Sequence, residues 1–85
     1  MAKLVFLGRL ADVAGKAEAE FCFSSPLDWP DVIAWLEDAF SVTLADSVRD
    51  PRIRLAVNGA VLADRESLVL NNGDELAFLP PVSGG

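Results

Sequence analysis

The chain has no histidine and only one cysteine, Cys22, among its 85 residues. Histidine is the side chain that most often acts as a general acid or base, and a lone cysteine forms neither an intramolecular disulfide nor a cluster of metal ligands. No nucleophile beside an activating base stands out elsewhere in the sequence. The sequence therefore predicts a protein that is not an enzyme by itself, with no catalytic residues, no metal site and no permanently bound cofactor.

Basic residues are also few, with 7 Lys and Arg against 13 Asp and Glu, which gives a net charge of -6. A surface of this sign repels phosphate backbones and anionic lipids, so nucleic-acid and membrane binding are not expected and a basic protein partner is favoured. No apolar run approaches the roughly 20 residues that a membrane-spanning helix needs. Residues 1–3 lead directly into a strand pattern without a secretory segment, so we expect a cytoplasmic protein.

Apolar residues are plentiful, at 52% of the chain with a mean hydropathy of +0.33. This length and composition predict one folded domain with a single modest core. Residues that alternate in character predict strands, and Asn-Gly and Asn-Gly-Asp turns separate some of them. The predicted strands are Lys3–Leu10, Ala17–Phe23, Arg52–Val57, Ala60–Ala63 and Glu75–Leu79.

One convincing helix is predicted, from about Trp29 to Phe40. Asp28 is a good N-cap, Asp31 follows three residues later, and Pro30 lies in the first turn, where its missing amide hydrogen costs nothing. The segment Ser41–Asp50 is predicted to be a loop with a short helical turn. Asp64–Leu70 is predicted to be a linker that tucks Leu68 and Leu70 under the core.

This order of elements predicts an α+β fold of the β-grasp, ubiquitin-like type, a mixed sheet with one main helix packed across one face. The first and last strands should be parallel neighbours inside the sheet. A ferredoxin-like sandwich is the competing fold, and it needs a second helix, for which only residues 45–48 give a weak signal.

In the predicted strand Ala17–Phe23, the thiol of Cys22 should point outward with Glu18 and Glu20.

The C-terminal segment differs in character from the domain of residues 1–79. Pro80 and Pro81 stop strand pairing and keep the chain extended as it leaves the sheet. Val82 and Ser83 follow, and then Gly84 and Gly85 end the chain without side chains. A backbone without side chains can enter a narrow channel and present its terminal carboxylate as the only reactive group. Residues 80–85 are therefore predicted to be a tail that partner proteins act on.

Four segments together resemble the small subunit of molybdopterin synthase, the MoaD family of sulfur carriers. They are Lys3–Leu7, Leu55–Asn58, Asn72–Phe78 and Leu79–Gly85, and they occur in the family's order along nearly the whole chain. The resemblance implies that an ATP-dependent enzyme adenylates Gly85, which a sulfur donor protein then helps convert to a thiocarboxylate. It also implies that the large synthase subunit receives this tail, in a heterotetramer of two small and two large subunits. There the sulfur passes to precursor Z, cyclic pyranopterin monophosphate, to form the dithiolene of molybdopterin.

The resemblance also implies partner contacts at Leu7, Val61, Phe78 and Leu79. The alternation of the strands independently places Leu7 and Leu79 on the outer face of the sheet, and Phe78 inward. At Ala11 the sequence departs from the family, in which arginine is frequent. Two other functions remain open, since the Gly-Gly chemistry is shared. One is sulfur carriage for thiamine thiazole or tungsten-cofactor synthesis, and the other is covalent protein modification of the ubiquitin kind.

Overall fold

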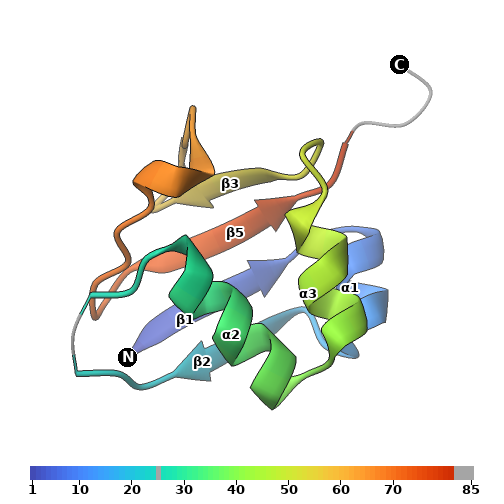
Figure 1. Ribbon diagram of the computed structural model, residues 1–85, viewed down its shortest axis with the longest axis horizontal. Coiled ribbons are helices and arrows are strands. Elements are labelled where there is room, and N and C mark those ends of the chain that lie inside the picture. Colours follow the sequence, from blue (N-terminus) through green and yellow to red (C-terminus); the bar gives the residue numbers. More distant parts are fainter. Residues whose placement is uncertain (25, 82–85) are drawn as a thin grey trace.

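The computed structural model describes residues 1–24 and 26–81, in which five strands form one mixed sheet in the order β2-β1-β5-β3-β4 (Figure 1). The central strands β1 and β5 are parallel, and the other neighbours are antiparallel. The strands are β1 Ala2–Phe6, β2 Glu18–Phe21, β3 Arg54–Val57, β4 Ala60–Val61 and β5 Glu75–Leu79. This arrangement confirms the predicted mixed β-grasp sheet with parallel first and last strands.

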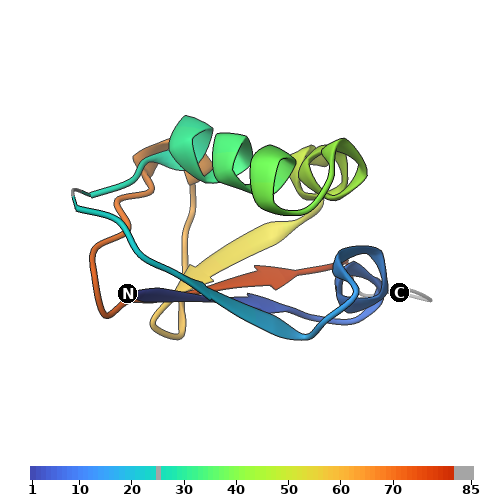
Figure 2. The ribbon, with the colours of Figure 1, turned by 90° about the horizontal axis from the view of Figure 1, so that it is seen from below.

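The helices α2 and α3 cover one face of the sheet, and no helix of the described residues covers the opposite face (Figure 2). The α1 helix follows β1 and packs against both β1 and α3. The helices are α1 Arg9–Ala14, α2 Trp29–Ala39 and α3 Val42–Arg49, and a 3-10 turn, η1, spans Arg65–Ser67. None of the helices in the described ranges is long and apolar enough to cross a membrane.

The core lies between the sheet and α2 with α3. Phe6 of β1 stacks on Phe78 of β5, with ring centroids 5.4 Å apart and planes only 4° from parallel. From α2, Val32 and Leu36 are fully buried against this layer. Asp28 caps α2 by accepting a hydrogen bond from the Asp31 amide, in a reciprocal capping box. The predicted position and cap of this helix are thus confirmed, and Leu68 and Leu70 are buried as predicted.

The predicted strands Ala17–Phe23, Arg52–Val57 and Ala60–Ala63 are shorter in the structure, and two further predictions about secondary structure were wrong. The first strand ends at Phe6, not Leu10, because Gly8 has φ +57° and turns the chain into α1, which buries Leu10. The segment expected to be mainly loop is the helix α3, whose N-cap Ser41 accepts a hydrogen bond from the Leu44 amide. Its β-branched and short polar residues are weak helix formers, so capping and tertiary burial must stabilise it.

The end of α3 is held by a side chain that lies more than ten residues further along the chain. The Arg65 guanidinium donates hydrogen bonds to the carbonyl oxygens of Val48, Arg49, Asp50 and Ile53, at distances of 2.8 to 3.2 Å. Its carbon Cζ lies 4.9 Å from the centroid of the Trp29 ring at the start of α2. Arg65 therefore satisfies the last carbonyl groups of α3 and links α3, β3 and α2.

Replacing Arg65 with alanine should lower the free energy of unfolding by about 2–3 kcal/mol, because several hydrogen bonds from a charged donor are lost. Arg65→Lys should recover only part of this loss, since an ammonium group cannot reproduce the planar fork. Urea unfolding monitored by tryptophan fluorescence measures both changes. The control is Arg52→Ala, which removes an exposed, solvent-screened ion pair and should cost much less than Arg65→Ala. Equal losses for Arg65→Ala and the control would contradict the stabilising role of Arg65.

Candidate functional site at the root of the C-terminal tail

The tail leaves from the interior of the sheet. Its preceding strand, β5, lies between β1 and β3, and its last residue, Leu79, pairs with Arg54 of β3. Pro80 follows directly and is half-buried, whereas Pro81 is exposed. Because β5 is held on both sides, the position from which the tail departs is fixed by the sheet. Val82, Ser83, Gly84 and Gly85 lie outside the described residues, so the roles assigned to them stay predictions.

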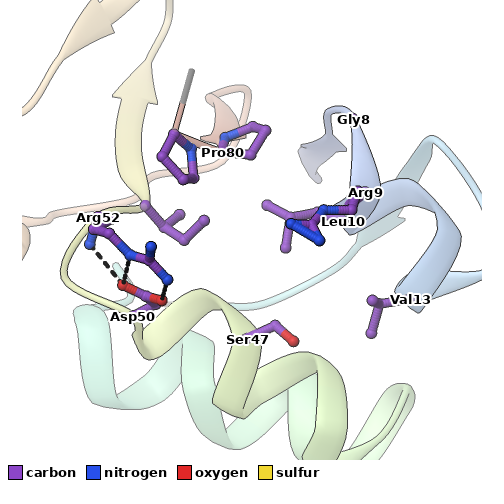
Figure 3. A pocket seen from close by; sticks show the side chains of 10 residues that line it. Gly8, Arg9, Leu10, Val13, Ser47, Asp50, Arg52 and Pro80 are labelled. Atoms are coloured by element: carbon purple, nitrogen blue, oxygen red, sulfur yellow. Dashed lines mark hydrogen bonds and ion pairs between the residues drawn. The ribbon is translucent and has the colours of Figure 1, made fainter. Parts of the chain in front are cut away.

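We refer to Leu79, Pro80 and Pro81 as the tail root. An open groove lies beside it, between α1, the end of α3 and the start of β3 (Figure 3). Its volume is about 590 Å³. The lining residues are Gly8, Arg9, Leu10, Val13, Ser47, Asp50, Arg52, Ile53, Pro80 and Pro81. Asp50 accepts two side-chain hydrogen bonds from Arg52, at 3.1 and 2.8 Å, and these bonds lower the pKa of its carboxyl group to about 2. This pair therefore stays charged at neutral pH, and the groove offers an apolar floor with a polar margin.

Gly8 lies close to the tail root, with no room for a side chain between them. A Cβ atom added to Gly8 would lie only 3.1 Å from Cγ of Pro80, and the backbone of Gly8 has φ +57° and ψ -132°, a conformation that essentially only glycine adopts. Gly8 could not be singled out from the sequence, because the alternating residues around it predicted a continuous strand. Gly8 therefore lets α1 begin close to the point where the tail leaves the sheet.

Gly8→Ala should destabilise the protein by about 1–3 kcal/mol and displace Pro80, because backbone strain and the added methyl group act together. Gly15→Ala is a matched control at the other end of α1. Gly15 also has a positive φ, +82°, but nothing lies within 4 Å of the added Cβ. Two-dimensional NMR and thermal unfolding should show altered resonances around Pro80 only for Gly8→Ala. If both variants left that region unchanged, the contact between Gly8 and the tail root would have no structural role.

The uncovered face of the sheet carries a continuous apolar surface. Val5 pairs with Ala77, Ala77 with Ala56, and Ala56 with Val61, so one row of small and apolar side chains crosses four strands. Leu7 and Leu79 lie beyond this row, towards the tail. We refer to Val5, Leu7, Ala56, Val61, Ala77 and Leu79 as the outer apolar face.

The predicted partner contacts differ in their exposure. Leu7 and Val61 are 40% and 58% exposed, and Leu79 is half-buried, so all three are accessible on the outer apolar face. Phe78 requires a correction, because its side chain is 0% exposed and stacks on Phe6 in the core. Phe78 therefore supports the sheet beneath the tail root and is not a surface for a partner.

Arginines stand on both sides of the tail root, although the protein is acidic overall. Arg9 begins α1 on the β1 side, and Arg54 lies on the β3 side, opposite Leu79. Both side chains are exposed, and in the described parts of the chain neither forms an ion pair. This arrangement could not be predicted from the sequence, because Arg9 and Arg54 are 45 positions apart and flank the tail root only through the order of the strands. Elsewhere on the surface, Cys22 is exposed as predicted.

The fold defines a β-grasp, ubiquitin-like domain in which Pro80 and Pro81 follow directly from a strand in the interior of the sheet. The sequence model of the ThiS family matches residues 4–85, and the chain therefore belongs to the ThiS family. It is therefore a small carrier-type protein of the ThiS and MoaD kind. A comparison with curated protein sequences gives no significant match.

Solved structures support the same fold. The crystal structure of SAMP1 from Haloferax volcanii is similar with a TM-score of 0.75 and 28% identity, over 99% of this chain and 98% of the other. The small archaeal modifier protein 1 from Methanosarcina acetivorans has a TM-score of 0.75 and 24% identity, over 99% and 95%. A complex of subunits 1 and 2 of the molybdopterin-converting factor from Helicobacter pylori gives 0.63 and 21%, over 99% and 97%. At these last two identities the similarity concerns the fold alone.

Proposed function

We propose that this protein is the sulfur carrier subunit of molybdopterin synthase, with Gly85 as the covalent carrier site. The observation that carries the proposal is the exit of a Pro-Pro-Val-Ser-Gly-Gly tail from the central strand β5, beside an uncovered apolar face. A tail fixed at its root and free of side chains at its tip suits insertion into the active site of another protein. The choice of molybdopterin synthase rests on the sequence resemblance of residues 72–85.

The chemistry must begin with activation of the terminal carboxylate. A free carboxylate is a poor electrophile, because attack on its carbon would add negative charge to a group that is already charged. In the proposed reaction a carboxylate oxygen attacks the α-phosphorus of ATP and pyrophosphate leaves. A sulfide equivalent from a donor protein then attacks the carbonyl carbon, the bond to AMP breaks, and a thiocarboxylate forms. The adenylating enzyme and the large subunit supply the catalytic groups, and this chain supplies the acyl group.

The outer apolar face is the proposed docking surface for these partners. Leu7, Val61 and Leu79 would be desolvated in the contact, and apolar side chains at the centre of an interface carry much of its affinity. Arg9 and Arg54 would face acidic groups around the entrance of the partner's channel. They would speed encounter and orient the tail more than they would add affinity.

A ubiquitin-like modifier is the second candidate, favoured by the similarity to SAMP1 across nearly the whole of both chains. The activated glycine would then form an isopeptide bond with a lysine of another protein instead of accepting sulfur. Sulfur carriage for thiamine thiazole or tungsten-cofactor synthesis is a third, because it would use the same tail chemistry.

Incubation with the adenylating enzyme of molybdopterin synthesis, ATP and a sulfur donor should increase the intact mass by about 16 Da, the difference between sulfur and oxygen. The loaded protein, mixed with the large subunit and precursor Z, should then return to its original mass as molybdopterin forms. A mass gain without molybdopterin would favour sulfur carriage for another pathway. Conjugates of higher mass in cell extracts, linked through Gly85 to lysine, would favour the modifier and contradict the proposed carrier if no thiocarboxylate accompanied them.

A further inference from the structure

The edge strand β2 has unpaired backbone groups that the proposed function does not use. The amide of Phe6 donates to the carbonyl oxygen of Ala17 at 2.7 Å, which fixes the phase of the antiparallel ladder between β1 and β2. Inward and outward backbone groups alternate along such a strand, so the N–H and C=O groups of Glu18 and Glu20 point away from β1. Figure 1 shows β2 as an outermost strand, with no described segment paired to this side.

A groove lies next to this edge, on the side of the sheet that faces α2. Its volume is about 440 Å³, and residues from β2, α2 and the α1–β2 connection line it. Trp35 and Phe40 are half-buried there, and the Trp35 ring stacks on Phe21 with centroids 4.3 Å apart. The ammonium group of Lys16 lies 5.9 Å from the centroid of the Phe40 ring. The groove therefore combines a rigid aromatic floor with a free strand edge.

We propose that β2 binds an extended segment of a partner protein in which basic and apolar side chains alternate. Such a segment would add a strand to the sheet through the backbone groups of Glu18 and Glu20. Side chains of an added strand alternate between the two faces, so one set would enter the groove beside Trp35. The other set would lie beside the exposed carboxylates of Glu18 and Glu20, where positive charge is favoured.

The charges at this edge select the partner. Glu18 already forms an exposed ion pair with Lys3, at 3.3 Å, whereas Glu20 has no ion-pair partner in the described residues. A second copy of this chain is a poor occupant, because pairing β2 with β2 would bring glutamates of both copies together between two molecules of charge -6. An acidic peptide is disfavoured for the same reason. The site is separate from the tail root, since β1 lies between β2 and β5.

The test uses the isotope-labelled full chain and a blocked synthetic peptide of alternating arginine and valine. Titration followed by NMR should shift the amide signals of Glu18 and Glu20 and the indole N–H signal of Trp35. The same peptide with N-methylated backbone nitrogens on its pairing side should bind at least about tenfold more weakly, because its donors are removed. The double variant Glu18→Gln and Glu20→Gln, which changes only exposed side chains, should also bind the unmodified peptide about tenfold more weakly.

Several results would overturn the proposal. Equal affinity for the N-methylated peptide would show that attraction between an acidic protein and a basic peptide is sufficient. Shifts confined to Leu7, Val61 and Leu79 would place the peptide on the outer apolar face instead. If a peptide of alternating glutamate and valine bound equally well, the carboxylates of Glu18 and Glu20 would not select for a basic partner. Concentration-dependent shifts of β2 without peptide, with a dimer in sedimentation, would assign the edge to self-association.

Discussion

Deletion of Gly85 is expected to abolish the gain of about 16 Da on incubation with an adenylating enzyme, ATP and a sulfur donor. The carboxylate would then belong to Gly84 and would end roughly 3.5 Å short of its position in the enzyme. Addition of one residue after Gly85 should be equally damaging, because the carboxylate would be displaced by the same distance in the other direction. Intact-mass measurement of the two variants and the unaltered protein gives the result directly.

Stability provides the control for these tail variants. Gly85 comes six positions after Leu79, the last residue of β5, so its deletion should leave thermal unfolding nearly unchanged. Gly84→Val should fold normally but load slowly, because a β-branched side chain would have to enter a channel that accepts bare backbone. A mass gain in the deletion variant would show that Gly85 does not bear the sulfur. Slow loading combined with a lower unfolding temperature would instead indicate damage to the domain.

Leu7→Asp and Leu79→Asp are expected to weaken binding to the large synthase subunit by about 2 kcal/mol or more, roughly 30-fold in Kd. Each substitution places a carboxylate on the outer apolar face, and complex formation would then require desolvation of a charge. The fold should tolerate both. Leu7 is exposed, and residue 79 lies opposite Arg54, where a carboxylate gains a cross-strand partner. Isothermal titration calorimetry with the purified subunit measures the affinity.

Val42→Asp is the matched control for these substitutions. Val42 is as exposed as Val61, at 58%, but it begins α3, which covers the opposite face of the sheet. The substitution makes the same change in net charge and should leave the affinity unaltered. If all three variants bound equally well, the outer apolar face would not be the docking surface. If all three bound equally poorly, net charge would explain the loss.

Several elements of the domain hold the tail root in place. β5 is hydrogen-bonded to β1 and to β3, and Phe78 stacks on Phe6 directly beneath the exit. Gly8 approaches Pro80 from α1, and Arg65 fixes the end of α3 beside the groove. The domain thus holds Pro80, the first residue of the tail, in one place relative to the sheet.

Features that depend on a local period or a local turn could be predicted from the sequence. Alternating residues located the strands and placed Phe78 inward and Leu79 outward, although the resemblance had also suggested Phe78 as a partner contact. Asp28 and the apolar stripe located α2, whose predicted end was only one residue too long. Asn58 and Gly59 predicted the hairpin of β3 and β4, and both have positive φ angles in the structure. The sequence also predicted a reactive tail over residues 80–85, and this stays a prediction.

Tertiary structure alone decided the features that join distant parts of the chain. The helices α1 and α3 are six and eight residues long, too short to be stable by propensity, and packing of Leu10 and Leu44 into the core holds them in place. Gly8 meets Pro80, and Arg65 reaches the carbonyl groups of α3, only because the sheet order brings these segments together. The groove at the tail root and the free edge of β2 follow from the same order. A linear pattern records what each residue prefers, whereas the position of a residue beside a distant segment depends on how the whole chain minimises its exposed apolar surface.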